Sequence, residues 1–283
     1  KYKKRFKASV IVNFENNLKC NFKARIRFNG DQKDHIVIKD NVLEQSIDVH
    51  LMSGHIYGIT KFKLLRDNTR GKLVDEIFLM ELLKQFNYLV PRTMHVNTKI
   101  SGFRSKMIFQ EKAVKELLEY NQRREGPIYE GDERFVWRLA QKVESNQLGS
   151  HAVGLLPLID SGFKSMLARQ VNTQLISRSK NHSLMSSNAL SNLNLAYLLY
   201  NNMYNESKIN QLEKYRFYTL NNDLLGFYEP ENILKLDVYN LLILSGNGYH
   251  ALSPNNRKFY WNPIENYFEP ITYDTMINID TEP

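Results

Sequence analysis

The residues best suited to chemistry lie near the C-terminus, at the borders of two short aromatic-rich segments. His250 precedes the pair Asn255 and Asn256, and Asp274 follows the second segment, after the turn at 261–266. A hairpin that starts after an Asn and ends in an Asp can bring two hard oxygen ligands to one metal ion. Protein kinases hold Mg²⁺ with a catalytic-loop Asn and a later Asp in this manner. The alternative is an ordinary hairpin in which Asn and Asp only form turns.

Such a site also needs a lysine on a central strand, paired with a carboxylate on the helix that packs beside it. Lys61 and Lys63 are two residues apart, so on a strand they point to the same face. Glu76 lies near the start of the helix that follows. The sequence therefore predicts the pair Lys63 and Glu76, with Lys61 as the alternative lysine. The competing interpretation is a solvated face of an edge strand.

Two further cations flank a turn signal in the first part of the chain. Arg27 and Lys33 lie on either side of Asn29-Gly30-Asp31. Both are candidates for phosphate contacts, because a basic side chain beside a tight turn can approach an anionic group. The alternative is that the residues between them only reverse the chain direction.

The periodicity of apolar residues predicts a sheet-rich part followed by a helical part. Strands are predicted at 6–12, 20–28, 46–51, 60–65, 91–98 and 103–110, with a helix at 73–86. After Glu111, helices are predicted at 112–120, 133–147, 160–179, 187–213 and 230–245, and then a hairpin at 257–274. The predicted fold is α+β, with an N-terminal lobe at 1–110 and a mostly helical C-terminal lobe at 111–283.

Composition narrows the class of protein without choosing a partner. The chain has 283 residues, a net charge of +8 and a pI of about 9.3. This balance favours acidic partners such as nucleotide phosphates, nucleic acid, anionic lipid or acidic protein. A single cysteine, Cys20, excludes an internal disulfide framework and a cysteine-rich zinc site.

Several other chemistries lack their sequence signatures. The chain contains no HExxH, GxSxG or P-loop motif. No RNA-binding signature is present, so a nucleic-acid partner is not expected. No apolar run approaches the length of a membrane span, and a membrane association is expected only through a segment that this chain does not contain.

An ordered set of segments resembles the spore coat protein H (CotH) kinase-like family, in a branch found outside spore-formers. The resemblance covers most of residues 20–280, and only loosely residues 145–230. The segments that carry it are 25–35, 62–65 followed by Arg70 and Glu76, 110–127, and the hairpin from His250 to Asp274.

The resemblance implies a two-lobed atypical kinase fold that binds ATP with Mg²⁺ or Mn²⁺ and lacks the usual Gly-rich loop. This chain likewise has no GxGxxG motif. On the family pattern, Asp274 and Asn256 (or Asn255) hold the metal, and the backbone of Glu111 faces the adenine. The implied acceptor is a protein or a cell-surface polymer. Related folds also use ATP for glutamylation or adenylylation, and relatives of this branch are often expected to be exported or membrane-anchored.

One departure from the family pattern concerns the residue that serves the acceptor. His250 stands where better-known members carry an Asp a few residues before the Asn. A histidine can accept a proton near neutral pH, which would preserve the transfer chemistry. The alternative is a pseudokinase that acts as a binding or assembly module of the cell envelope. The short stretch after Asp274 also suggests a truncated C-terminal lobe.

Overall fold

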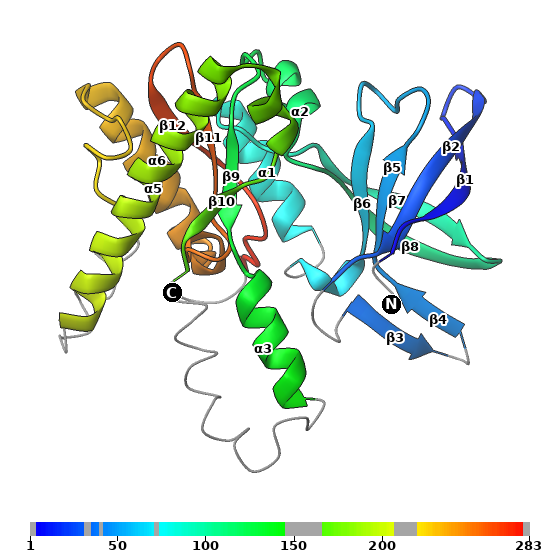
Figure 1. Ribbon diagram of the computed structural model, residues 1–283. Coiled ribbons are helices and arrows are strands. Elements are labelled where there is room, and N and C mark those ends of the chain that lie inside the picture. Colours follow the sequence, from blue (N-terminus) through cyan, green and yellow to red (C-terminus); the bar gives the residue numbers. More distant parts are fainter. Residues whose placement is uncertain are drawn as a thin grey trace. The chain divides into compact units, whose positions relative to one another are not determined.

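A computed structural model describes residues 4–30, 35–39, 42–70, 74–144, 166–206 and 220–279 (Figure 1). The chain divides into two compact units, Lys1–Arg123 (unit 1) and Arg124–Pro283 (unit 2). The sequence analysis places a boundary earlier, between 110 and 111. Helix α2 (Lys115–Tyr120) belongs to unit 1 in this division.

Unit 1 is built on a six-stranded antiparallel sheet that curls, in the order β1-β2-β5-β6-β8-β7 (Figure 1). Its strands are β1 (Phe6–Asn13), β2 (Lys19–Phe28), β5 (Ile47–Leu51), β6 (Lys61–Arg66), β7 (Thr93–Ile100) and β8 (Phe103–Glu111). A separate hairpin, β3 (Ile36–Lys39) and β4 (Val42–Gln45), is inserted between β2 and β5. A short 3₁₀ helix, η2 (Asp67–Thr69), follows β6.

The alternation of apolar residues explains why these strands share one core. On β2, Phe22 and Ala24 are buried while their sequence neighbours are exposed. Together with residues from the adjacent strands they form one apolar cluster, in which the Phe62 and Phe109 rings stack with centroids 4.5 Å apart. The alternating pattern therefore gives the sheet one apolar face and one polar face.

Helix α1 (Asp75–Gln85) lies between β6 and β7 in the chain and contacts β7. Leu79, Met80 and Leu83 are buried, which matches one face of a helix with 3.6 residues per turn. The same helix buries Glu76 completely. A predicted site residue is thus part of the interior of unit 1.

The described part of unit 2 combines three helices with a four-stranded antiparallel sheet in the order β10-β9-β11-β12. The strands are β9 (Ile128–Gly131), β10 (Ala168–Gln170), β11 (Lys258–Asn262) and β12 (Tyr267–Ile271). The helices are α3 (Arg134–Glu144), α5 (Lys180–Glu206) and α6 (Pro230–Ser245), with the 3₁₀ turns η4 (Thr173–Arg178) and η6 (Tyr249–Leu252).

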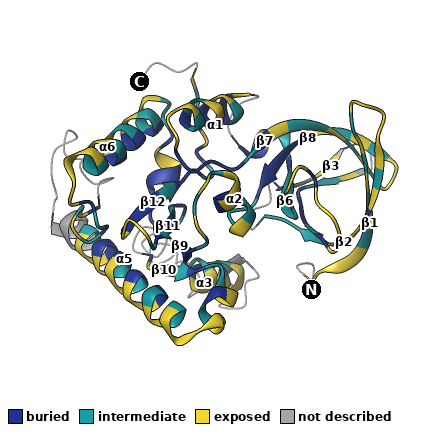
Figure 2. Cartoon of the chain, turned by 90° about the horizontal axis from the view of Figure 1, so that it is seen from above, coloured by how far each residue is buried: buried dark blue, intermediate teal, exposed yellow. Residues whose placement is uncertain are grey.

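Large aromatic side chains fill the core of unit 2. Tyr129, Tyr197, Phe259 and Phe268 are almost fully buried. Tyr129 also donates a hydrogen bond from its hydroxyl to the carbonyl of Ser186 on α5, at 2.8 Å. In Figure 2, α5 accordingly shows buried positions along one side and exposed positions along the other.

The expectation of a mixed α+β protein with an antiparallel sheet is confirmed. Residues 230–245 are helical as predicted. The helix predicted at 160–179 is wrong where the structure describes it, because β10 and η4 occupy 168–178. Residues 160–165 lie outside the described residues.

The long helix of unit 2 also begins earlier than predicted. The helix predicted at 187–213 corresponds to α5, which begins at Lys180. Ser179 explains the difference, since its hydroxyl accepts a hydrogen bond from the backbone N–H of His182 at 3.2 Å, as an N-cap residue does. Residues 207–213, the predicted end of this helix, lie outside the described part of the chain. Among the described helices, none is both long and apolar enough to cross a membrane.

Candidate functional site

The loop that carries His250 is fixed by hydrogen bonds within a few residues. The Ser253 hydroxyl donates to the carbonyl of His250 at 2.9 Å, and the backbone N–H of Asn256 donates to the carbonyl of Ser253 at 3.0 Å. The buried Arg257 donates from Nε to the carbonyl of Leu252 at 2.5 Å. The segment from η6 to β11 therefore has one defined course, which places its polar side chains reproducibly.

Three predicted residues come together beside this loop. Nδ2 of Asn256 lies 2.9 Å from Nε2 of His250, and the same Nε2 lies 3.8 Å from Oδ2 of Asp274. With the amide nitrogen donating, Nε2 of His250 is the acceptor, and the neutral ring carries its proton on Nδ1. Asn256 is buried, whereas the side chain of His250 is 42% exposed. The imidazole thus borders solvent, with the amide and the carboxylate beside it.

The backbone at Asp274 adopts a conformation that is uncommon outside glycine. Its φ is +49°, in the left-handed region, three residues after the end of β12. The chain is held beyond this point, because the backbone N–H of Asn278 donates to the carbonyl of Gly246 at 2.9 Å. Strained positions of this kind concentrate at functional sites. Eight other non-glycine residues of the described chain also have a positive φ, so the conformation alone does not single out Asp274.

Strand β9 supports the same loop through a close approach of backbones. A Cβ added to Gly131 would lie 2.6 Å from the carbonyl oxygen of Pro254 and from the Cα of Asn255. Only glycine allows this contact, since real Cβ atoms do not approach backbone atoms so closely. The loop that bears Asn255 and Asn256 is therefore packed directly on β9.

Glu133 is a site residue that the sequence analysis missed. Its Oε1 accepts a hydrogen bond from Nδ2 of Asn255 at 3.4 Å, and its Oε2 accepts one from Nε1 of Trp137 at 3.2 Å. Burial raises the pKa of this carboxyl group. In the sequence, the only local signal for Glu133 is its spacing from Trp137 on one helical face. Its other partner, Asn255, is 122 residues away in the chain.

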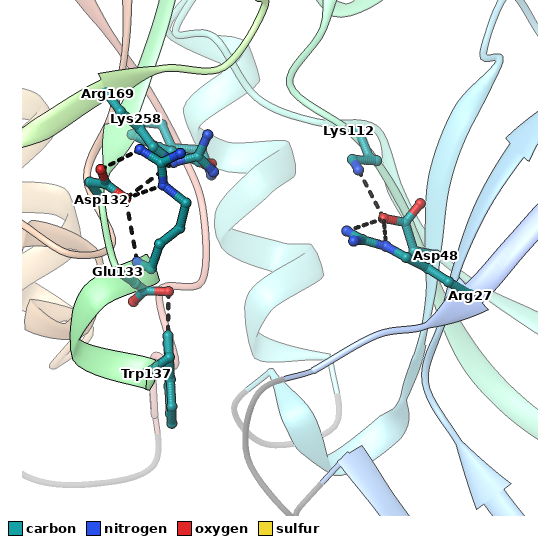
Figure 3. A network of polar contacts seen from close by, with 10 residues as sticks. Arg27, Asp48, Lys112, Asp132, Glu133, Trp137, Arg169 and Lys258 are labelled. Atoms are coloured by element: carbon teal, nitrogen blue, oxygen red, sulfur yellow. Dashed lines mark hydrogen bonds and ion pairs between the residues drawn. The ribbon is translucent and has the colours of Figure 1, made fainter. Parts of the chain in front are cut away.

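A row of charged side chains crosses the sheet next to Glu133 (Figure 3). Arg169 on β10, Glu130 on β9 and Lys258 on β11 are opposite one another in register, and Glu130 forms ion pairs with both cations. Lys258 also lies over the ring of Tyr273, 4.2 Å from its centroid. Burial lowers the pKa of Lys258, but Glu130 and Tyr273 outweigh this effect and raise it overall. Lys258 is therefore a charged, largely buried residue that lies over Tyr273, the residue before Asp274.

In unit 1, the predicted lysine and carboxylate share a neighbour. Lys63 is opposite Gln110 in the register of β6 and β8, and Nε2 of Gln110 donates to Oε1 of Glu76 at 3.4 Å. Lys61 lies two residues earlier on the same face of β6. The pairing of Lys63 with Glu76 stays a prediction, and Gln110 is an additional polar residue between the two positions.

The other predicted residues of unit 1 are engaged in ion pairs. Arg27 binds Asp48 with Nη2 and Nε at 2.9 and 3.1 Å (Figure 3). The carboxylate of Glu111 is held by Arg92 at 2.6 and 2.8 Å, and the backbone N–H of Glu111 donates to the carbonyl of Arg92. The roles predicted for Arg27 and Glu111 stay predictions. Lys33 lies outside the described residues.

Asp48 is the centre of a charge cluster that the sequence analysis did not anticipate. This carboxylate is fully buried and binds Arg5 at 2.8 Å, Arg27 at 2.9 Å and Lys112 at 3.0 Å. Burial by itself raises the pKa of Asp48, but Lys112, Arg5 and Arg27 together lower it to about 2. One buried anion thus neutralises part of the charge of three cations.

The oxygen atoms of Asp274 and Asn256 suit a hard cation. Mg²⁺ is usually bound by one or two carboxylates, with waters and substrate phosphates completing the octahedron. Across the described ranges, no group of three His, Cys, Asp or Glu side chains is placed to hold a metal ion by itself.

Comparison with protein-family models finds no match, and comparison with curated proteins finds none either. The functional argument therefore depends on the geometry of the two units.

Proposed function

We propose that the chain is an atypical kinase-like transferase that uses ATP with Mg²⁺ or Mn²⁺ and acts on a protein or a cell-surface polymer. The observation that carries the proposal is the convergence of His250, Asn256 and Asp274 at the ends of the β11–β12 hairpin. Their order along the chain is that of a catalytic loop, a hairpin and a metal-binding Asp.

The chemistry of these side chains supports distinct roles. Asp274 and the amide oxygen of Asn256 would hold the cation, which neutralises charge on the transferred phosphate. The half-exposed imidazole of His250 would orient the acceptor hydroxyl and take up its proton. Asn256 positions the ring by donating to Nε2 at 2.9 Å, so this contact has to open before Nε2 takes up the acceptor's proton.

The order of elements in unit 1 gives further support. A strand with two lysines is followed by a helix with a buried Glu and then by two paired strands, as a kinase N-terminal lobe requires. Lys63 and Glu76 flank Gln110 in this arrangement. We therefore assign phosphate placement to Lys63, with Lys61 and Arg27 as further cations of the same polar face.

A thermal-shift titration of the whole chain with ATP tests the proposal. A ligand that binds only the folded protein adds about 2.7 kcal/mol to its stability at a hundredfold excess over Kd. We expect stabilisation by ATP only when Mg²⁺ or Mn²⁺ is present, and its loss in Asp274→Ala. Asp237→Ala, at an exposed position of α6, is the matched control and should retain the shift. The absence of a shift with millimolar ATP and metal would overturn the proposal.

The second candidate is a pseudokinase that binds nucleotide and assembles envelope components without transfer. The observation that favours it is the engagement of His250 Nε2 with Asn256, since this atom would otherwise be the proton acceptor. ATP turnover separates the candidates. Turnover that is lost in His250→Ala while the thermal shift remains indicates the enzyme, whereas a shift without turnover in the unchanged chain indicates the binding module. Release of ADP or of pyrophosphate then distinguishes phosphoryl transfer from adenylylation.

A further inference from the structure

The polar face of the sheet in unit 1 carries an unusual row of basic residues. Lys7, Arg25, His50 and Lys61 are directly opposite one another across β1, β2, β5 and β6. Directly paired residues of an antiparallel sheet lie on the same face, about 5 Å apart, and like charges in such pairs are destabilising. We call this face, with Lys23, Arg27 and Lys63 of the neighbouring rows, the basic face. Its composition is unfavourable for stability unless an anion compensates it.

The acidic side chains of unit 1 do not balance this face. On the polar side of these four strands, Asp48 is the one carboxylate among the residues that the structure describes, and it is already shared by three cations. Lys7, Lys23 and Arg25 are exposed and form no ion pair with any described residue. Glu116 of α2 contacts Thr60, and acts electrostatically on His50. The basic face therefore keeps a surplus of positive charge.

The distribution of charge along the chain shows the same asymmetry. Lys1–Arg123 contains 24 Lys and Arg against 13 Asp and Glu, a net charge of +11. Arg124–Pro283 contains 14 against 17, a net charge of −3. The basic character of the whole protein thus belongs to unit 1. A surface of one sign attracts a partner of the opposite sign and accelerates its association.

Two ionisable groups, His50 on the basic face and Lys112 beside it, have pKa values that are lowered first by burial and then by nearby cations. Burial lowers the pKa of His50, and Lys61 and Arg5 lower it further. Burial also lowers the pKa of Lys112, and Lys63 and Arg27 add to that effect while Asp48 opposes it. Both directions agree with a face on which additional positive charge is disfavoured.

From the register of the strands we infer that the basic face binds an extended acidic segment of a polypeptide. Side chains at alternate positions of a strand are about 6.8 Å apart, so Lys23, Arg25 and Arg27 repeat at the spacing of alternate carboxylates in an extended peptide. Arg27 of this row already binds a carboxylate, that of Asp48, at 2.9 Å. Among the described residues, no Phe, Tyr or Trp lies on this face of the four strands, so the stacking platforms of single-stranded nucleic-acid binders are missing there.

This inference does not depend on the proposed transfer reaction. Binding is measured without ATP or metal, and Asp274→Ala should bind the acidic peptide as well as the unchanged chain. The two proposals can therefore fail separately.

The test measures fluorescence anisotropy of a labelled peptide of alternating Glu and Ala, titrated with the whole chain at low ionic strength. The test variant combines Lys7→Gln, Lys23→Gln and Arg25→Gln. The control variant combines Lys99→Gln, Arg104→Gln and Lys106→Gln, which removes the same charge from exposed positions of β7 and β8. Circular dichroism confirms that both variants remain folded.

We expect the test variant to bind the peptide about tenfold more weakly, since three ion pairs that each contribute little alone are lost together. The control variant should bind the peptide within about twofold of the unchanged chain. Equal losses of peptide affinity in both variants would mean that only net charge matters, and this would overturn the inference. A lack of peptide binding by the unchanged chain would also overturn it. Polyphosphate and a single-stranded oligonucleotide serve as competitors at equal charge. If either displaces the peptide better than the unlabelled peptide does, the polypeptide assignment is wrong.

Discussion

The two units use ion pairs in different ways. In unit 2, Glu130 stands between Lys258 and Arg169, and Asp132 pairs with Arg134 at 2.6 Å, so that carboxylates and cations alternate. In unit 1, the single buried Asp48 faces three cations. The balanced network of unit 2 mainly stabilises the sheet that supports the candidate site. The unbalanced cluster of unit 1 also leaves positive charge that an anionic partner could compensate. Polar residues of similar type therefore form a balanced network in one unit and leave uncompensated positive charge in the other.

The largest expected effect comes from breaking the network of unit 2. Glu130→Gln leaves Lys258 and Arg169 without their shared carboxylate in a largely buried position. We expect a loss of about 3 kcal/mol in the free energy of unfolding, the usual cost of an uncompensated buried charge. Urea denaturation measures it. Glu265→Gln, on the exposed turn of the hairpin, is the control and should change stability by less than about 0.5 kcal/mol. Equal effects of the two substitutions would contradict a structural role for the network.

The corresponding change in unit 1 should cost less. Asp48→Asn removes a carboxylate whose pKa is lowered from 3.8 to about 2, which corresponds to about 2 kcal/mol of stability at pH 7. Because the folded pKa is the lower one, the contribution is complete above about pH 4 and is lost as the pH falls toward 2. Unfolding of both proteins between pH 7 and pH 3 checks this. A difference between the two proteins that stays constant with pH would show that charge is not its cause.

A double variant tests whether the cations that surround Asp48 in unit 1 repel one another. Without Asp48, the half-buried Lys112 ammonium is left beside Arg27 and Lys63. Adding Lys112→Gln to Asp48→Asn should therefore restore about 1 kcal/mol, although Lys112→Gln alone destabilises the protein. A double-mutant cycle in urea measures this coupling. Additive losses would mean that the cations of unit 1 do not repel one another appreciably.

The smallest effect is expected at Glu133. Burial raises the pKa of this carboxyl group, so the folded state disfavours its charged form increasingly as the pH rises above the ordinary value of 4.5. Glu133→Gln should leave stability at pH 4 nearly unchanged and raise it slightly at pH 7, since Gln can still accept the Trp137 hydrogen bond. Thermal unfolding at the two pH values tests the direction. A loss at both would assign Glu133 a structural role.

The sequence predicts those parts of the fold whose signals are local. Strands with alternating apolar residues, such as 20–28, and the helix at 230–245 are in place because their patterns need no distant partner. Strands β9 and β10 were missed because three or four residues show no periodicity, and their pairing with β11 and with each other is set by tertiary contacts. The start of α5 was missed because Ser179 acts as a cap within a stretch that is polar throughout.

The candidate site divides in the same way. His250, Asn256 and Asp274 could be proposed from the sequence, since a single hairpin separates them. Glu133 and Gly131 could not be proposed, because their contacts with Asn255 join segments that are far apart in the chain. The overall net charge does not show that the positive charge is concentrated in unit 1. The row of basic residues from Lys7 to Lys61 follows only from the register of the strands.

The close packing of Gly131 on Asn255 has a consequence for how the protein folds. Contacts of long sequence separation form slowly, because a large loop must close before they contribute any stabilising energy. Strand β9 meets the loop after η6 only when nearly all of unit 2 has been synthesised and collapsed. The arrangement of His250, Asn256 and Asp274 should therefore mature late in folding, after the hairpin itself has formed. Intermediates of unit 2 would contain the hairpin without a finished site.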